Sequence, residues 1–236
     1  MIKYVSAFSL SILLLLALVG SAENIVRLSV FVLGLIVVTY FVNYARIGFA
    51  WPHLLLPSFF LIAVGLSYAV ITTSTLRVIF SIIATILFYF LEIKLGRESH
   101  YLQGIFIFST FGIYTGLFAL EFYINLNIWF LLLGVILFTY FFSLHGFAGF
   151  ELKTKKNFIW VIILIVFQAA LGLLLWPAHF LIDASVLFII FYLLWIFSVS
   201  AFLGKLTMKK IYMQLVLVGI FLAIILSSAA WTPLIT

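Results

Sequence analysis

The sequence predicts an all-α polytopic membrane protein with nine transmembrane helices, its N-terminus inside and its C-terminus outside. Composition is the first observation: 67% of the residues are hydrophobic and 8% are charged, whereas a soluble domain carries about 25% charged residues. The second is the length of the apolar runs, roughly 20 residues each, without the apolar/polar alternation of a membrane β-barrel. The third is that most of the basic residues between those runs fall on one side of the membrane.

Nine apolar runs follow one another with short linkers, and each is long enough to cross a bilayer as a helix. The runs are 4–22, 24–44, 52–71, 74–94, 100–120, 126–145, 157–176, 180–202 and 209–230. No polar stretch is long enough for a soluble domain, so residues 1–236 are expected to form a single transmembrane domain. The linker ELKTKK at 151–156 is expected to be a turn that faces solvent or lipid headgroups.

The first run has two interpretations. A basic residue, Lys3, precedes an apolar stretch that ends in the small residues Gly20, Ser21 and Ala22, which is also the pattern of a cleaved signal peptide. The apolar stretch is long for a signal peptide, so a retained first helix is favoured. Cleavage would leave eight spans in the same orientation.

The other eight runs pair into four hairpins that start outside and turn inside. Of the 12 basic residues, those that fall on one side are Lys3, Arg46, Lys94, Arg97, Lys153, Lys155, Lys156, Lys205, Lys209 and Lys210. Only Arg27 and Arg77 fall on the other side. Because cytoplasmic linkers are rich in Lys and Arg, the N-terminus is expected inside and the plasma (inner) membrane is the expected location. These linkers also explain the formal charge of +6, which therefore does not indicate a nucleic-acid partner.

The four hairpins are similar in length and are candidates for an internal repeat. They cover 24–73, 74–123, 124–177 and 178–230. The first and third share a fragment, TYFVNYARIGFA at 39–50 and TYFFSLHGFAGF at 139–150. Parallel repeats occur in transporters, with sites between the repeats. The alternative is that aromatic belts and basic inner linkers produce the same pattern without duplication.

Two similar Trp-Pro segments each contain a histidine, WPHLLLP at 51–57 and WPAHFLID at 176–183. His53 falls near the inner interface and His179 near the outer one, so a bilayer of about 30 Å separates them and they cannot share a metal. Trp at headgroup level and Pro in a first helical turn explain both segments. The other ionisable residues near the inner span ends include His100, His145, Glu92, Glu98 and Glu151. They lack metal-ligand spacing, and the chain has no cysteine, so no metal and no cofactor are expected.

Four charged residues near the outer ends of the spans form the candidate site: Arg27, Arg77, Glu121 and Asp183. Each arginine lies in the first turn of a helix, where a cation opposes the helix dipole, so an anionic partner is expected. The arginines are predicted to hold a phosphate or carboxylate in a shallow site open to the outer leaflet, with Asp183 or Glu121 as an acid or base. The alternative is that they pair with these acids, with Glu23 or with lipid headgroups.

Small residues at every fourth position mark two helix faces that let another helix approach closely. Gly112 and Gly116 form one such face, and Gly219, Ala223 and Ser227 form the other. Such faces are expected to pack within the chain; the alternative is contact with a protein partner or a second copy.

The motifs of common enzymes are missing from the sequence, which has no Walker loop, no GxGxxG and no GxSxG. Ionisable residues are also missing from the middle of the spans, where ion-coupled transporters usually keep them. We therefore expect a non-enzymatic binding, transport-related or accessory membrane component that handles a lipid or other amphiphile, with membrane lipids as partners. Two alternatives remain: an enzyme that acts on a lipid-linked substrate at the outer face, and a structural subunit of a membrane complex.

Overall fold

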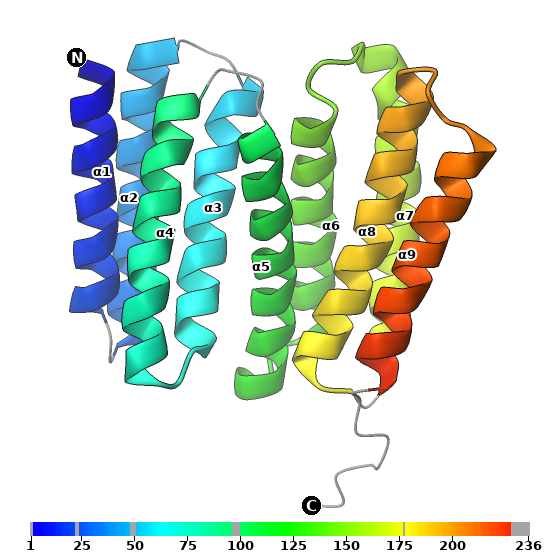
Figure 1. Cartoon of the computed structure of the whole chain (residues 1–236). Coiled ribbons are helices and arrows are strands. Elements are labelled where there is room, and N and C mark those ends of the chain that lie inside the picture. Colours follow the sequence, from blue (N-terminus) through cyan, green and yellow to red (C-terminus); the bar gives the residue numbers. More distant parts are fainter. Residues whose placement is uncertain (1, 22–23, 48–50, 96–99, 177, 228–236) are drawn as a thin grey trace, which may run out of the picture. The chain divides into compact units, whose positions relative to one another are not determined.

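The computed structural model describes residues 2–21, 24–47, 51–95, 100–176 and 178–227 (Figure 1). In these residues it forms nine α-helices: α1 (Ile2–Gly20), α2 (Ile25–Ile47), α3 (Trp51–Val70), α4 (Ser74–Lys94), α5 (His100–Ile124), α6 (Ile128–Gly146), α7 (Leu152–Leu174), α8 (Phe180–Phe202) and α9 (Met208–Ser227). The residues Glu23, Arg97 and Glu98 lie outside the described part, as do the side chains of His53, His100 and Lys153.

The all-helical class predicted from the sequence is confirmed for the described residues. Eight of their helices, all except α3, are long and apolar enough to cross a membrane. The apolar stretch described for α3, Leu54–Val70, is shorter. Many large apolar side chains on these helices are exposed, for example Phe41 at 65% and Trp160 at 57%. Lipid tails are the natural cover for such side chains, so the structure indicates a membrane protein.

The expectation that ELKTKK is a turn was wrong, because α7 already begins at Leu152. Lysine is a good helix former, so a helix can continue into a basic segment, and the length of an apolar run then gives too short a helix. Lys155 is also 7% exposed rather than solvated. Its Nζ donates to the carbonyl oxygen of Phe147 at 3.4 Å, just past the end of α6, where a cation interacts well with the helix dipole.

The chain divides into two compact units, residues 1–116 and 117–236, with the boundary inside α5. In the first unit, α1 packs against α2 and α4, and α3 packs against the same two helices. The four helices therefore close a ring. Phe60 and Phe88 are buried between these helices, and their rings stack with 5.8 Å between the centroids. The ring of Phe108, on α5, lies 5.7 Å from that of Phe60.

The first part of α5 joins this unit through its small-residue face. A Cβ atom at Gly116 would lie 2.5 Å from the Leu66 Cβ, and one at Gly112 would lie 2.9 Å from the Ala63 Cβ. Real Cβ atoms do not approach so closely, so the two glycines are required for α5 to lie against α3 at this distance. The expectation that this face packs within the chain is confirmed.

In the second unit, α6, α7, α8 and α9 pack in chain order, and α6 also contacts α8. The rings of Phe142 and Phe191 meet in its core, with 6.0 Å between the centroids. In the part of the chain that the structure describes, α9 packs against α8, and of its described side chains only Val218 is buried. A Cβ atom at Gly219 would meet nothing within 4 Å, so no described residue packs closely there.

Candidate functional site

The four charged residues predicted to form a site divide between the two units. Arg27 lies in the first turn of α2 and Arg77 in the first turn of α4, both in the first unit. Glu121 lies in the last turn of α5 and Asp183 in the first turn of α8, both in the second unit. The two arginines and the two acids are therefore described separately, each pair within its own unit.

Arg77 lines a pocket at the starts of α2 and α4, which we call the arginine pocket. Its volume is about 270 Å³. Its lining residues are Ser21, Asn24, Ile25, Leu28, Tyr68, Ala69 and Arg77. Arg27 is exposed and does not line it, so of the two predicted arginines the structure brings only Arg77 to this pocket.

Local contacts fix the direction of the Arg77 side chain. Its Nε donates to the carbonyl oxygen of Ile71 at 2.6 Å, which ties α4 to the end of α3. Its guanidinium carbon lies 5.5 Å from the centroid of the Tyr68 ring, a distance at which a cation is attracted to the ring face. Arg77 is only partly exposed, so its charge is less well screened than that of a solvated arginine.

Asn24 also lines the arginine pocket and caps α2. Its Oδ1 accepts from the backbone N–H groups of Val26 at 2.9 Å and Arg27 at 3.1 Å. The positive end of the α2 dipole therefore lies beside the pocket. Together with the Arg77 guanidinium, this end of the helix makes the pocket favourable for an anion.

Asp183 and Glu121 form a second polar cluster, the carboxylate pair. Asp183 is 6% exposed, and its Oδ1 has no hydrogen-bond partner among the described residues. Glu121 is half-buried and close enough for its charge to act on the Asp183 carboxyl group. Two carboxylates near each other, one of them buried, repel unless a proton or cation lies between them.

Aromatic contacts hold the end of α5 against the start of α8 and so place the carboxylate pair. The Phe122 ring lies 5.3 Å from that of His179 and 5.5 Å from that of Phe180. The Tyr123 ring lies 5.5 Å from that of Phe180. His179 also caps α8, because its Nδ1 accepts from the Leu181 N–H at 3.3 Å. The proline of this Trp-Pro segment was expected in a first helical turn, but α8 begins three residues later at Phe180, and Pro177 itself lies outside the described residues.

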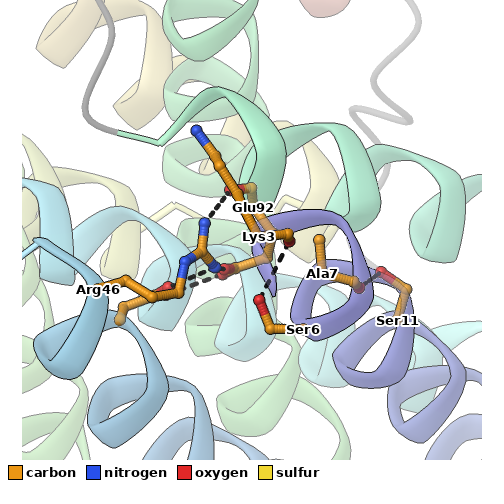
Figure 2. Close-up of polar contacts among 7 residues, drawn as sticks. Lys3, Ser6, Ala7, Ser11, Arg46 and Glu92 are labelled. Atoms are coloured by element: carbon orange, nitrogen blue, oxygen red, sulfur yellow. Dashed lines mark hydrogen bonds and ion pairs between the residues drawn. The ribbon is translucent and has the colours of Figure 1, made fainter. Parts of the chain in front are cut away.

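A third polar cluster lies at the other end of the first unit and was not predicted. Figure 2 shows the Arg46 side chain reaching the carboxylate of Glu92, with Lys3 of α1 beside them. Arg46 Nη1 donates to Glu92 Oε2 at 3.1 Å and Nη2 donates to the Glu92 carbonyl oxygen at 3.0 Å. Asn43 Nδ2 donates to Glu92 Oε1 at 3.0 Å.

This network is a structural connection between α2 and α4. The Glu92 side chain is 0% exposed and that of Arg46 is 13% exposed, and both carboxylate oxygens of Glu92 accept hydrogen bonds. From the sequence, Arg46 was expected in a basic linker and Glu92 near a span end. The missed signal was the spacing of Asn43 and Arg46, which places both on one face of a helix.

Metal binding finds no support in the described residues. Among them, no group of three or more His, Cys, Asp or Glu side chains is arranged to hold a metal ion. The side chain of His53, one of the two histidines of the Trp-Pro segments, lies outside the described part.

Comparisons with known proteins give no relative of this chain. No protein-family model, no curated protein and no solved structure matches it. The chemistry of its own residues is therefore the ground for a functional proposal.

Proposed function

We propose that this chain is a non-enzymatic plasma-membrane protein that binds a lipid or other amphiphile through an anionic headgroup. The observation that supports this most strongly is the arginine pocket. It combines an oriented guanidinium, a helix N-terminus and a volume of about 270 Å³. Guanidinium groups and helix N-termini both favour phosphate and carboxylate.

The pocket is suited to a headgroup rather than to a whole ligand. Pockets that enclose drug-sized ligands have volumes of about 300–1,000 Å³, and this one is slightly smaller. Exposed apolar side chains occur among its lining residues and their neighbours in the sequence: Ile25, which lines the pocket, is 56% exposed, Val26 is 67% exposed and Leu76 is 55% exposed. An anionic headgroup held by Arg77 would leave its acyl tails against these side chains, as in a bilayer leaflet.

The proposal includes nine transmembrane spans, with the N-terminus inside and the C-terminus outside. The nine helices that follow one another along the described residues and the basic residues of the inner linkers support this arrangement. In it the arginine pocket opens at the outer interface, where lipid headgroups lie.

A structural subunit of a larger membrane complex is the second candidate, and one observation favours it. Helix α9 exposes large apolar side chains along most of its length, including Tyr212 at 65% and Ile220 at 57%. A partner helix would cover them, although lipid covers such side chains equally well. An enzyme is less well supported, because it needs Arg27, Arg77, Glu121 and Asp183 to converge on one substrate.

Native mass spectrometry of the detergent-purified full chain tests the proposal. We expect a bound mass in the range of an anionic amphiphile on the natural chain. Since hydrogen bonds to a charged group contribute about 1.5–3 kcal/mol, Arg77→Ala is expected to weaken this binding about 10- to 100-fold. Arg77→Lys keeps the charge without the planar fork, so its loss of binding should be smaller.

Two control variants separate a pocket from general attraction of lipid by basic residues. Arg27 is exposed and outside the pocket, so Arg27→Ala should have little effect. Lys209 is exposed at the start of α9, and Lys209→Ala should leave the bound mass unchanged. The absence of any bound mass, or equal binding by all the variants, would argue for a structural subunit instead.

A further inference from the structure

The hydroxyl group of Tyr68 is a buried polar group for which the described chain supplies no partner. Tyr68 lies near the end of α3, lines the arginine pocket and is 3% exposed. Its ring faces the Arg77 guanidinium, but no described residue forms a hydrogen bond with its hydroxyl group. A buried tyrosine hydroxyl usually has such a partner. The missing partner therefore points to a polar group that reaches the pocket from outside the chain.

Ser21 brings a second hydroxyl group to the same pocket and can use it only as an acceptor. This residue lines the arginine pocket and is 3% exposed. Its Oγ donates its proton to the carbonyl oxygen of Ala17, one turn back along the chain. A hydroxyl group has one proton and two lone pairs, so a ligand that bonds to the Ser21 Oγ must supply the donor.

The charge of the pocket decides what kind of donor this is. Asp and Glu are absent from the described residues that line it, whereas Arg77 and the start of α2 both contribute positive charge. An ammonium group would be able to donate to Ser21 but would meet like charge in the pocket. An uncharged hydroxyl group donates without this cost, so the pocket favours a ligand that combines an anion with hydroxyl groups.

We infer that the amphiphile of the proposed function is a phosphodiester lipid whose headgroup alcohol is a polyol such as glycerol. A phosphodiester has two ester arms, so one arm carries the apolar tails and the other carries the hydroxyl groups. The phosphate lies at Arg77 and the start of α2, and the polyol donates to Ser21 and bonds with the Tyr68 hydroxyl. This inference rests on the proposed function, since it takes the same pocket and names the chemical class that the pocket selects.

Phosphatidylglycerol and phosphatidylpropanol with identical acyl chains are the matched probes. They have the same charge and the same tails, and they differ in the hydroxyl groups of the headgroup. Native mass spectrometry of the full chain, titrated with each lipid in detergent, measures the two affinities. We expect phosphatidylglycerol to bind at least about fivefold more tightly, because each of two hydrogen bonds between uncharged groups contributes about 2- to 10-fold.

Variants then assign the selectivity to named side chains. Tyr68→Phe keeps the ring that faces Arg77, and Ser21→Ala keeps a small side chain. Each should lower the affinity for phosphatidylglycerol about 2- to 10-fold and leave that for phosphatidylpropanol unchanged. The double variant should bind the two lipids equally. Arg77→Ala should instead weaken the binding of both lipids by the same factor.

Ser29→Ala and Tyr212→Phe are the matched controls. Ser29 lies in α2 outside the lining of the pocket, and its hydroxyl group donates to the Ile25 carbonyl oxygen. Tyr212 lies in α9 and is 65% exposed. Neither change should alter the ratio of the two affinities.

The outcomes separate this inference from the proposed function. Equal affinities of the natural chain for the two lipids, with both weakened in Arg77→Ala, would keep the anion site and overturn the polyol, since water would then satisfy the two hydroxyl groups. Tighter binding of phosphatidylethanolamine than of phosphatidylglycerol would assign the donor to an ammonium group and overturn it as well. An affinity ratio that survives the double variant would place the recognition of hydroxyl groups elsewhere on the chain. The absence of any bound lipid would overturn both this inference and the proposed function.

Discussion

Replacement of Arg46 by methionine is expected to be among the most destabilising single changes at the polar positions of the first unit. The change removes both hydrogen bonds from Arg46 to Glu92, those to Oε2 and to the carbonyl oxygen. It also leaves the Glu92 carboxylate, which is 0% exposed, with the hydrogen bond from Asn43 and the nearby charge of Lys3.

The magnitude follows from the burial of the pair. Removal of one partner from a buried ion pair costs about 3–5 kcal/mol, because the other charge stays buried; the Asn43 hydrogen bond and the charge of Lys3 place the expected loss at the lower end of this range. The Arg46 side chain is 13% exposed, so solvent screening reduces this value little. For a chain of this size the loss corresponds to a decrease in melting temperature of about 6–20 °C.

Chemical or thermal unfolding of the purified chain in detergent, followed by tryptophan fluorescence, measures the effect. Arg46→Lys retains the charge but not the two-pronged geometry, so about 1–2 kcal/mol of destabilisation is expected. The exposed Arg27 is a matched control, and Arg27→Ala should change the free energy of unfolding by less than about 0.5 kcal/mol.

A double variant decides whether the cause is the unpaired charge. Addition of Glu92→Gln to Arg46→Met removes the buried charge, so the double variant should be more stable than Arg46→Met alone. The reasoning would be refuted by a double variant that loses the sum of the two single effects. A loss below about 0.5 kcal/mol for Arg46→Met would refute it equally.

Two further outcomes follow from the helix packing and from the proposed topology. A Cβ atom at Gly116 would lie 2.5 Å from the Leu66 Cβ, so Gly116→Ala should destabilise the chain by about 1–3 kcal/mol in the same unfolding assay. Gly34→Ala, where a Cβ would meet nothing within 4 Å, should be neutral or stabilising by up to about 1 kcal/mol, and similar losses at both positions would contradict the packing. Because the chain has no cysteine, single cysteines at Asn127 and Lys205 should react with an impermeant thiol reagent from opposite sides of sealed vesicles. Labelling of both from one side would exclude the proposed topology.

Much of the helical framework could be read from the sequence, because a bilayer imposes one simple rule. Every backbone polar group in a spanning segment must be satisfied within that segment, so an apolar run of sufficient length is a helix. The run predicted at 180–202 is α8 itself, and the run at 74–94 is α4. The rule fails where a helix continues into charged residues, and for that reason Leu152 and the lysines after it were assigned to a turn.

Only the tertiary structure decided which polar residues meet. Arg27 and Arg77 share a charge and a place in a first helical turn, yet the structure brings one of them to a pocket and leaves the other exposed. Arg46 and Glu92 lie 46 residues apart, and no local pattern connects them. The apolar runs determine that helices form but hardly how each is rotated about its axis, because nearly every side of such a helix is apolar. Rotation is set by packing, as where α5 lies against α3 through Gly112 and Gly116, and it determines which of the few polar side chains become buried partners.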